Sequence, residues 1–195
     1  MKFAAVILAG GISKRFGSEE ELKQNIMLNG KPVWKHVYDT AESHFDEIAI
    51  VGKDVPRGET RQESVSNGIF SIDDCDYVVI FDAARPLVTH EQIEEIKKEV
   101  IESCSVSFGV EPTDTILYEG NYRRSGLIAL QVPQAFWLDM LRAAHEKTHL
   151  KNATDDTIIF EDMFGVKPKI LTGGANLYKL TDKDDLKILK ALCEK

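Results

Sequence analysis

The residues best suited to chemistry in this 195-residue sequence lie in three loops that follow apolar stretches. The first loop holds a glycine pair, Gly10 and Gly11, followed by two basic residues, Arg15 and Lys23. Small residues let backbone N–H groups approach an anion closely, and the basic side chains can add positive charge. The loop matches neither common glycine-rich phosphate motif. It therefore indicates either another kind of phosphate site or a plain tight turn.

The second loop, "RGETRQESV", spans residues 57–65. Gly58 falls between an expected strand and an expected helix, and Glu59 and Ser64 could hydrogen-bond to the edge of a base. The alternative is a helix cap with exposed charges. By itself this loop is a weak signal.

The third loop, "FDAARP", spans residues 81–86 and ends an apolar run. Asp82 is placed to bind a metal ion or a substrate hydroxyl, and Arg85 to bind a phosphate. The alternative is a buried structural pair between Asp82 and Arg85.

Alternating strands and helices must position these loops. Apolar runs typical of buried strands cover residues 3–8, 48–51, 77–81 and 106–110. Helical patterns cover residues 33–45, 61–70, 89–103 and 181–195. The third helix should begin with a capping box between Thr89 and Gln92, and the last with Thr181 as its N-cap. This alternation predicts an α/β fold with a mainly parallel sheet, in which ligands bind at the carboxyl ends of the strands.

One segment interrupts the alternation. Residues 114–131, "DTILYEGNYRRSGLIALQ", contain two β-like runs around a turn at Glu119, Gly120 and Asn121. The pattern predicts an inserted hairpin, which is either a surface decoration or an arm that reaches a partner subunit.

Composition narrows the class of protein. The chain is 43% hydrophobic and 29% charged, and its net charge of -8 comes without a block of basic residues. These values are typical of a soluble globular protein and argue against nucleic acid or a membrane as a partner. The three cysteines match no zinc or redox spacing, and "FAAVILA" is too short for a membrane span. We expect one domain, residues 1–195, in the cytoplasm.

The sequence "HEKTH", residues 145–149, matches the H-E-x-x-H pattern of zinc peptidases. It lies at the polar end of an expected helix, and no third zinc ligand stands out. We expect an exposed helix end, where a histidine suits the C-terminal dipole.

Taken in order, the motifs resemble a known family. They are "LAGGISKRFG", "LKQ", "GETRQESV", "DAARP", "PTDT", "RSGLIALQVPQAF", "ATDD" and "YKLTDKDDL". Together they resemble the 2-C-methyl-D-erythritol 4-phosphate cytidylyltransferases, which have a Rossmann-like nucleotidyltransferase fold, and relatives that act on ribitol 5-phosphate. The single motifs are weak, but the ordered set covers nearly the whole chain.

The resemblance implies roles for individual residues. The expected catalytic cations are Arg15, Lys23 and Lys179. The expected nucleotide-binding residues are Ala9, Gly10, Gly11, Ser13, Gly58, Glu59, Ser64 and Ala83. The expected contacts to the second substrate are Asp82, Arg85, Thr115, Arg124 and Asp155. The resemblance also implies Mg²⁺ or another divalent cation, held in part by Asp82, and a homodimer in which the hairpin arm completes the partner's site.

The implied reaction is attack by a polyol phosphate on the α-phosphorus of CTP, with release of pyrophosphate. A phosphate monoester has a second pKa of about 6, so the nucleophile is already ionised at neutral pH and needs no general base. The site must instead neutralise charge and align the reactants. Isoprenoid precursor biosynthesis is the implied pathway.

The chain departs from the family at several positions. Ser13 replaces a usual glycine, Leu22 a proline, Phe81 a histidine and Val132 a threonine. The change at Val132 removes a hydroxyl near the acceptor phosphate and bears on which polyol phosphate is used. Ribitol 5-phosphate remains an alternative acceptor. A molybdopterin guanylyltransferase and a non-catalytic nucleotide-binding module are further alternatives.

Overall fold

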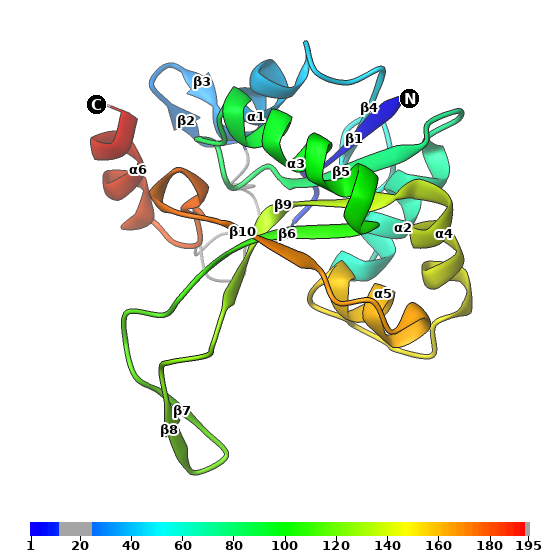
Figure 1. The fold of residues 1–195 in the computed structure, drawn as a ribbon. Helices are drawn as coiled ribbons and strands as arrows, with labels where there is room; N and C mark the ends of the chain where they lie inside the picture. The colour runs from blue at the N-terminus through cyan, green and yellow to red at the C-terminus, as the bar shows by residue number, and fades with distance from the viewer. Residues whose placement is uncertain (12–24, 194–195) are drawn as a thin grey trace.

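A six-stranded sheet forms the centre of the molecule (Figure 1). The structure is a computed structural model that describes residues 1–11 and 25–193. Ser13, Arg15 and Lys23, for which the sequence predicts roles at the phosphates, lie outside the described residues. The strands are β1 (Phe3–Leu8), β4 (Glu47–Val51), β5 (Tyr77–Asp82), β6 (Ser105–Val110), β9 (Ala129–Trp137) and β10 (Lys169–Thr172).

The sheet is mainly parallel, as the sequence predicts. Its strand order is β10-β6-β9-β5-β1-β4. The strand β1 pairs in parallel with β4 and β5, and β10 pairs in parallel with β6. Only β9 of these six strands runs antiparallel, between β5 and β6. Strand β9 continues directly from the hairpin segment, so the arm is attached to the middle of the sheet.

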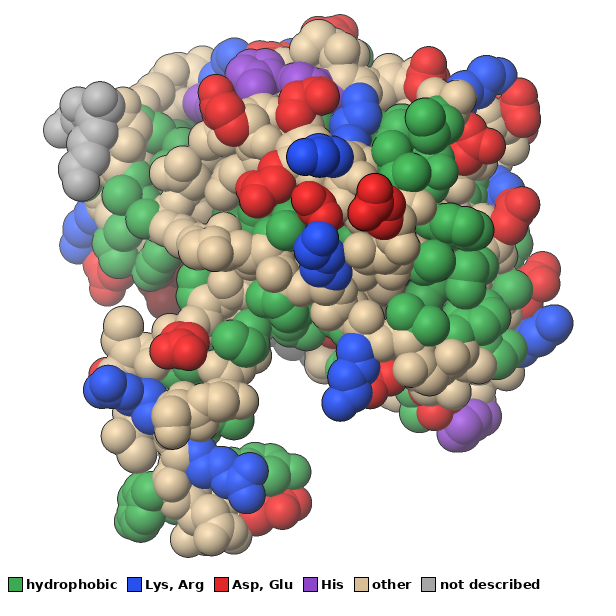
Figure 2. Space-filling view, viewed as in Figure 1, with side chains coloured by type: hydrophobic (Ala, Val, Ile, Leu, Met, Phe, Trp, Pro, Cys, Tyr) green, Lys and Arg blue, Asp and Glu red, His purple; other side chains and the backbone are tan. Residues whose placement is uncertain are grey.

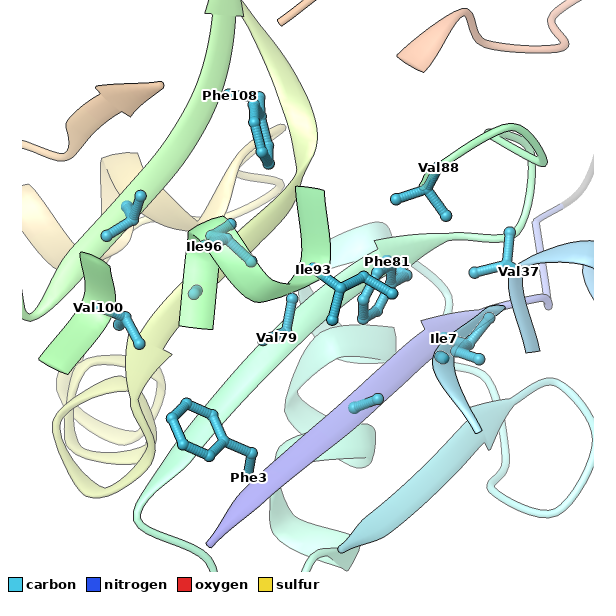
Figure 3. Packing of buried hydrophobic residues seen from close by; sticks show 14 of the residues in the cluster. Phe3, Ile7, Val37, Val79, Phe81, Val88, Ile93, Ile96, Val100 and Phe108 are labelled. Atoms are coloured by element: carbon cyan, nitrogen blue, oxygen red, sulfur yellow. The ribbon is translucent and has the colours of Figure 1, made fainter. Parts of the chain in front are cut away.

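Helices cover both faces of the sheet. On one face α1 (Val33–Ala41) and α3 (His90–Ser103) pack over Ile7 of β1 and over Val79 and Phe81 of β5 (Figure 3). On the other face α2 (Arg61–Ser71), α4 (Leu138–Lys147) and α5 (Asp156–Phe164) pack over Val6 and Ile80. Because successive strand residues point to opposite faces, a strand buried on both faces reads as a continuous apolar run. This explains the unbroken apolar sequence of β1 and β5.

Side chains at the helix ends fix where several helices begin. Thr60 and Glu63 form a capping box at the start of α2, and Thr89 and Gln92 form the predicted one at the start of α3. Two predicted boundaries are wrong. The first helix, α1, ends at Ala41 rather than residue 45. The last helix, α6 (Asp185–Cys193), begins later than predicted.

The cause of the late start of α6 is local hydrogen bonding. The carboxylate of Asp182 accepts bonds from the backbone N–H groups of residues 184 and 185, at 2.9 and 3.2 Å. Thr181 instead donates its own N–H to Asp185 Oδ2, at 2.6 Å. Asp182 therefore satisfies the helix start that the sequence pattern assigned to Thr181.

The predicted hairpin projects away from the sheet (Figure 1). It consists of β7 (Ile116–Tyr118) and β8 (Asn121–Arg123), paired antiparallel. Large apolar side chains on it are exposed, including Leu117, Tyr118 and Tyr122. Figure 2 shows hydrophobic groups on the surface of the projecting arm. The remaining short elements are the pair β2 (Met27–Leu28) and β3 (Lys31–Pro32), and the 3-10 helix η2 (Ala175–Leu177).

Candidate active site

A cavity of about 370 Å³ opens at the carboxyl ends of β1 and β5. This is the edge of a parallel sheet where ligands are expected. The described residues that line it come from four segments of the chain, which are far apart in sequence. They are Leu8, Gly10, Gly11, Arg57, Gly58, Glu59, Thr60, Arg61, Ser64, Asp82, Ala83, Ala84 and Lys179.

The glycine loop lies close against the end of β4. Ala9 is buried, and its N–H donates to the carbonyl of Val51 at 2.8 Å. A Cβ on Gly10 would lie 2.7 Å from Cβ of Arg57, and one on Gly52 would lie 2.4 Å from Cα of Gly10. Gly52 also has a φ of +98°, which side chains rarely adopt. Bare backbone at both positions therefore lets the loop fold over the cavity edge.

The 58–64 segment is held by its own hydrogen bonds. Ser64 Oγ accepts from the N–H of Gly58 at 3.1 Å and donates to the carbonyl of Thr60 at 2.8 Å. Glu63 accepts from the N–H of Glu59 at 2.7 Å. A Cβ on Gly58 would lie 2.2 Å from Cβ of Glu63, so only glycine fits there. This self-contained loop presents the exposed Glu59 beside the cavity.

The third loop places a carboxylate among cations. Lys179 Nζ donates to Asp82 Oδ2 at 2.6 Å, and Arg85 Nε lies 3.9 Å from the same oxygen. The backbone N–H of Ala83 donates to the carbonyl of Leu8 at 3.1 Å, which fixes this loop beside the glycine loop. Lys179 comes from the far end of the sequence but is brought here because Leu180 N–H donates to the carbonyl of Ala84 at 2.8 Å.

Electrostatics keep this carboxylate ionised. Burial disfavours the charge on Asp82, but the cations Lys179, Arg61 and Arg85 outweigh burial and hold its pKa well below the ordinary value. Burial also lowers the pKa of Arg85, although the Asp82 carboxylate opposes that shift. The guanidinium of Arg85 donates to the carbonyl of Leu177. The predicted structural pair between Asp82 and Arg85 is thus part of a larger charged cluster.

Arg61 is a cavity residue that the sequence reading did not single out. Its Nη1 donates to Asp156 Oδ2 at 2.7 Å, and His145 Nε2 lies 3.3 Å from the other oxygen of that carboxylate. The sequence contained a sign of this role, because Arg61 is a basic residue at the first position of α2. A cation is unfavourable at a helix N-terminus unless it has an acidic partner.

The expectation for the "HEKTH" motif is wrong for its first histidine. The side chain of His145 is only 1% exposed and packs against the buried Asp156, whereas that of His149 is 82% exposed. The two histidines therefore do not form one ligand pair. Within residues 1–11 and 25–193, no group of three or more His, Cys, Asp or Glu side chains could hold a metal ion. Tertiary packing of α5 on α4 buries the histidine, which the helix pattern alone could not reveal.

Four predicted acceptor contacts, Arg85, Thr115, Arg124 and Asp155, are not among the described residues that line this cavity. Thr115 and Arg124 are exposed at the base and return of the hairpin. Asp155 is the N-cap of α5: its Oδ1 accepts from the N–H of Thr157 at 3.0 Å, and its Oδ2 accepts from Gln134 Nε2 at 2.8 Å. Within the described part of the chain, the cavity brings six of the predicted nucleotide residues together with Asp82 and Lys179: Gly10, Gly11, Gly58, Glu59, Ser64 and Ala83. Ala9 is buried and is not part of this lining.

The donor set is compatible with one magnesium ion. Asp82 is an ionised carboxylate in the cavity wall, and Mg²⁺ is commonly held by one or two carboxylates together with substrate phosphates.

None of the helices in the described part of the chain has the length and apolar composition of a membrane span.

The fold and the cavity are those of an α/β enzyme whose ligand site lies at the carboxyl ends of parallel strands. The model of the family "2-C-methyl-D-erythritol 4-phosphate cytidylyltransferase" matches residues 3–195. The chain belongs to this family.

Individual relatives agree with the family match. A 2-C-methyl-D-erythritol 4-phosphate cytidylyltransferase of Clostridium perfringens (strain SM101) is 34% identical over 217 residues, covering 95% of this chain and 96% of the relative. One of Clostridium botulinum (strain Loch Maree) is 30% identical over 227 residues, covering 100% of this chain and 98% of the relative.

Solved structures show the same fold. The bifunctional IspDF of Campylobacter jejuni has a TM-score of 0.85 at 25% identity. This match covers 96% of our chain and 54% of the bifunctional one, so the chain spans about half of that protein. The cytidylyltransferase of Thermus thermophilus has a TM-score of 0.83 at 21% identity, and the match covers 100% of both chains.

Proposed function

We propose that this chain is the cytidylyltransferase of its family, acting as one domain over residues 1–195. It transfers CMP from CTP to 2-C-methyl-D-erythritol 4-phosphate and releases pyrophosphate, in isoprenoid precursor biosynthesis. The observation that carries the proposal is the single cavity wall shared by the glycine loop, the 58–64 segment and the Asp82–Lys179 pair.

The cavity offers a distinct surface to each part of CTP. The 58–64 segment reads the cytosine through the Glu59 carboxylate and the fixed Gly58 backbone, and Ser64 keeps that backbone in place. Backbone N–H groups of the glycine loop face the triphosphate, with Arg15 and Lys23 as its cations. The small side chain of Ala83 leaves room for the ribose beside Asp82.

The reacting groups need charge neutralisation more than proton transfer. The acceptor phosphate attacks the α-phosphorus as a dianion, because its second pKa is about 6. Lys179 is half-exposed at the cavity and is held at 2.6 Å from Asp82, so its ammonium is preplaced near the reacting phosphates. Fixed charges of this kind stabilise charge that develops in the transition state. A bound Mg²⁺ on Asp82 would neutralise phosphate charge in the same region.

The acceptor side of the site comes from two chains in this proposal. Thr115 and Arg124 flank the two paired strands of the arm, which extends away from its own sheet (Figure 1). Exposed apolar side chains on the arm, including Leu117 at 61% and Tyr122 at 77% exposure, favour contact with another protein surface. A homodimer in which each arm enters the partner's site accounts for both features.

A pyrophosphate-release assay tests the activity. The purified chain is given CTP, ATP, GTP or UTP, each with 2-C-methyl-D-erythritol 4-phosphate or ribitol 5-phosphate and Mg²⁺. We expect release with CTP and the methylerythritol phosphate, and loss of release without the divalent cation. Turnover of GTP without CTP turnover would contradict the proposal. CTP binding without release for any acceptor would favour a binding module.

A further inference from the structure

Three buried or half-buried side chains from three helices meet beside the cavity. His145 of α4 lies 3.3 Å from one oxygen of Asp156, and Arg61 of α2 donates to the other oxygen at 2.7 Å. The side chains of His145 and Asp156 are 1% and 0% exposed, and that of Arg61 is 23% exposed. Burying such a group of ionisable side chains contributes little net stability compared with apolar packing. Stability alone therefore does not explain their presence.

The position of Arg61 joins two parts of the site. Arg61 follows the segment Gly58–Thr60 directly and opens α2, while Asp156 follows Asp155 and opens α5. Arg61 lines the cavity, and its charge also acts on the Asp82 carboxylate. The buried Nη2 of Arg61, Nε2 of His145 and Oδ1 of Asp156 have no hydrogen-bond partner among the described residues. The Arg61 side chain thus links the 58–64 segment to the start of α5, and its charge acts on Asp82.

The two segments joined by Arg61 depend on it to different degrees. The 58–64 segment is held by its own capping box and by Ser64. The segment before α5 is instead tied to α2 from outside: Gln62 bonds the backbone of Leu150 and Ala153, at 3.0 and 2.9 Å. The Arg61–Asp156 pair completes that attachment. Loss of the Arg61–Asp156 pair should loosen the start of α5 and leave the 58–64 segment in place.

We propose that Arg61, held by Asp156, whose other carboxylate oxygen lies beside His145, is a positioning residue that fixes the start of α5 relative to the 58–64 segment. The pair thereby sets acceptor binding and alignment more than CTP binding, because the backbone of residues 58–60 is held by Ser64 and Glu63. This inference rests on the proposed cytidylyltransferase activity, and it assigns a role to the first histidine of the "HEKTH" motif.

Substitution of the three residues tests this role. Arg61→Lys keeps the charge but cannot reproduce the planar fork toward Asp156. We expect the KM for the acceptor to rise about tenfold or more and kcat to fall, because small misplacements in a reacting complex are costly. The Kd for CTP, measured by calorimetry without acceptor, should stay within about twofold.

His145 provides a second test that preserves the arginine. His145→Gln can place an amide N–H close to where Nε2 lies, 3.3 Å from Asp156 Oδ1, whereas His145→Leu leaves no polar group there. We expect the leucine variant to raise the acceptor KM and the glutamine variant to restore it toward the wild-type value. A purely packing role for His145 predicts no such rescue, because leucine also fills the space.

Arg142→Gln is the matched control. Arg142 is 21% exposed and donates to the carbonyls of Ile69 and Ile72 at the other end of α2. We expect this variant to lower the melting temperature while the acceptor KM and kcat stay within about twofold of wild type. The proposal is overturned if Arg61→Lys changes the acceptor KM no more than Arg142→Gln does, or if CTP affinity falls equally. Absence of pyrophosphate release by the wild-type chain would instead contradict the proposed function.

Discussion

At the scale of single residues, Asp82 is the centre of the charge balance in the cavity. Its carboxylate is almost fully buried, yet three cations keep its pKa low. The nearest of them, Lys179, is also the most exposed to the cavity, at 40%. A cation held this way is preorganised: it does not have to move when charge develops on the phosphates.

Removing that cation should impair the reaction more than the fold. We expect Lys179→Ala to lower kcat about 100-fold or more, the usual effect of losing one preorganised donor. The measurement is steady-state pyrophosphate release at saturating substrates. Lys187→Ala is the control, because Lys187 is an exposed lysine on α6 paired with Asp184. Equal losses in both variants would contradict the role given to Lys179.

The buried carboxylates of Asp82 and Asp156 make the free energy of unfolding depend on pH in a defined direction. Burial raises the pKa of Asp156, but Arg61 and His145 outweigh it and leave the folded-state pKa below the ordinary value. A carboxyl whose pKa is lowered by folding contributes its full stability above the unfolded value, about 4, and loses it as pH falls through the folded value.

We therefore expect the free energy of unfolding to fall as pH drops below about 4, with Asp82 and Asp156 both contributing. Asp156→Asn should be less stable at pH 7, by about 3–5 kcal/mol, because Arg61 loses its buried partner. Its stability should also change less between pH 5 and pH 3. Urea unfolding at several pH values measures both effects. An unchanged pH slope in the variant would show that Asp156 is not the titrating group.

At the scale of elements, the cavity depends on how closely the ends of two strands approach. The loops after β1 and β4 touch through Gly10 and Gly52. The register of the sheet brings them together, since Leu8 pairs with Val51 at the last position of both strands. Parallel pairing thus converts two glycines that are distant in sequence into one edge of the cavity.

Gly52→Ala should disturb this edge. The added Cβ would meet Gly10 Cα at 2.4 Å, and alanine is strained at a φ of +98°. We expect the free energy of unfolding to fall by about 1–3 kcal/mol and CTP affinity to fall with it. Gly174→Ala is the control, because a Cβ there meets nothing within 4 Å and its backbone is extended. Denaturant unfolding and CTP calorimetry measure the two quantities. Normal CTP affinity in Gly52→Ala would argue against this edge as part of the nucleotide site.

At the scale of the whole molecule, the proposed homodimer would divide the site between the arm of one chain and the body of the other. Arg124 belongs to the arm and Lys179 to the body that carries the cavity. If each arm completes the partner's site, a dimer of one arm variant and one body variant contains one intact site and one site with both defects.

We expect Arg124→Ala and Lys179→Ala each to be inactive as homodimers, and an equal mixture to regain about a quarter of the wild-type activity after subunit exchange. Half of the dimers would be mixed, and each would hold one intact site. Light scattering on the mixture as it elutes from a size-exclusion column verifies that the chains are dimeric. Failure to regain activity in confirmed mixed dimers would place the arm at its own chain's site instead.

The sequence alone indicated most of the local structure. Apolar runs gave β1 with the observed bounds and β5 to within one residue, because burial on both faces leaves no polar position. The capping box at Thr89 located α3, because capping depends on residues three positions apart. The ordered motifs also indicated the family that the comparisons show.

Only the tertiary structure decided which distant side chains meet. Asp82 and Lys179 are 97 positions apart, and Arg61 and Asp156 are 95 apart, so no local pattern could pair them. The place of β9 between β5 and β6, and the burial of His145, likewise depend on how elements pack. Local sequence fixes periodicity and caps because these involve neighbours along the chain. The charged cluster beside the cavity arises from contacts between elements, which form only when the sheet and its helices assemble.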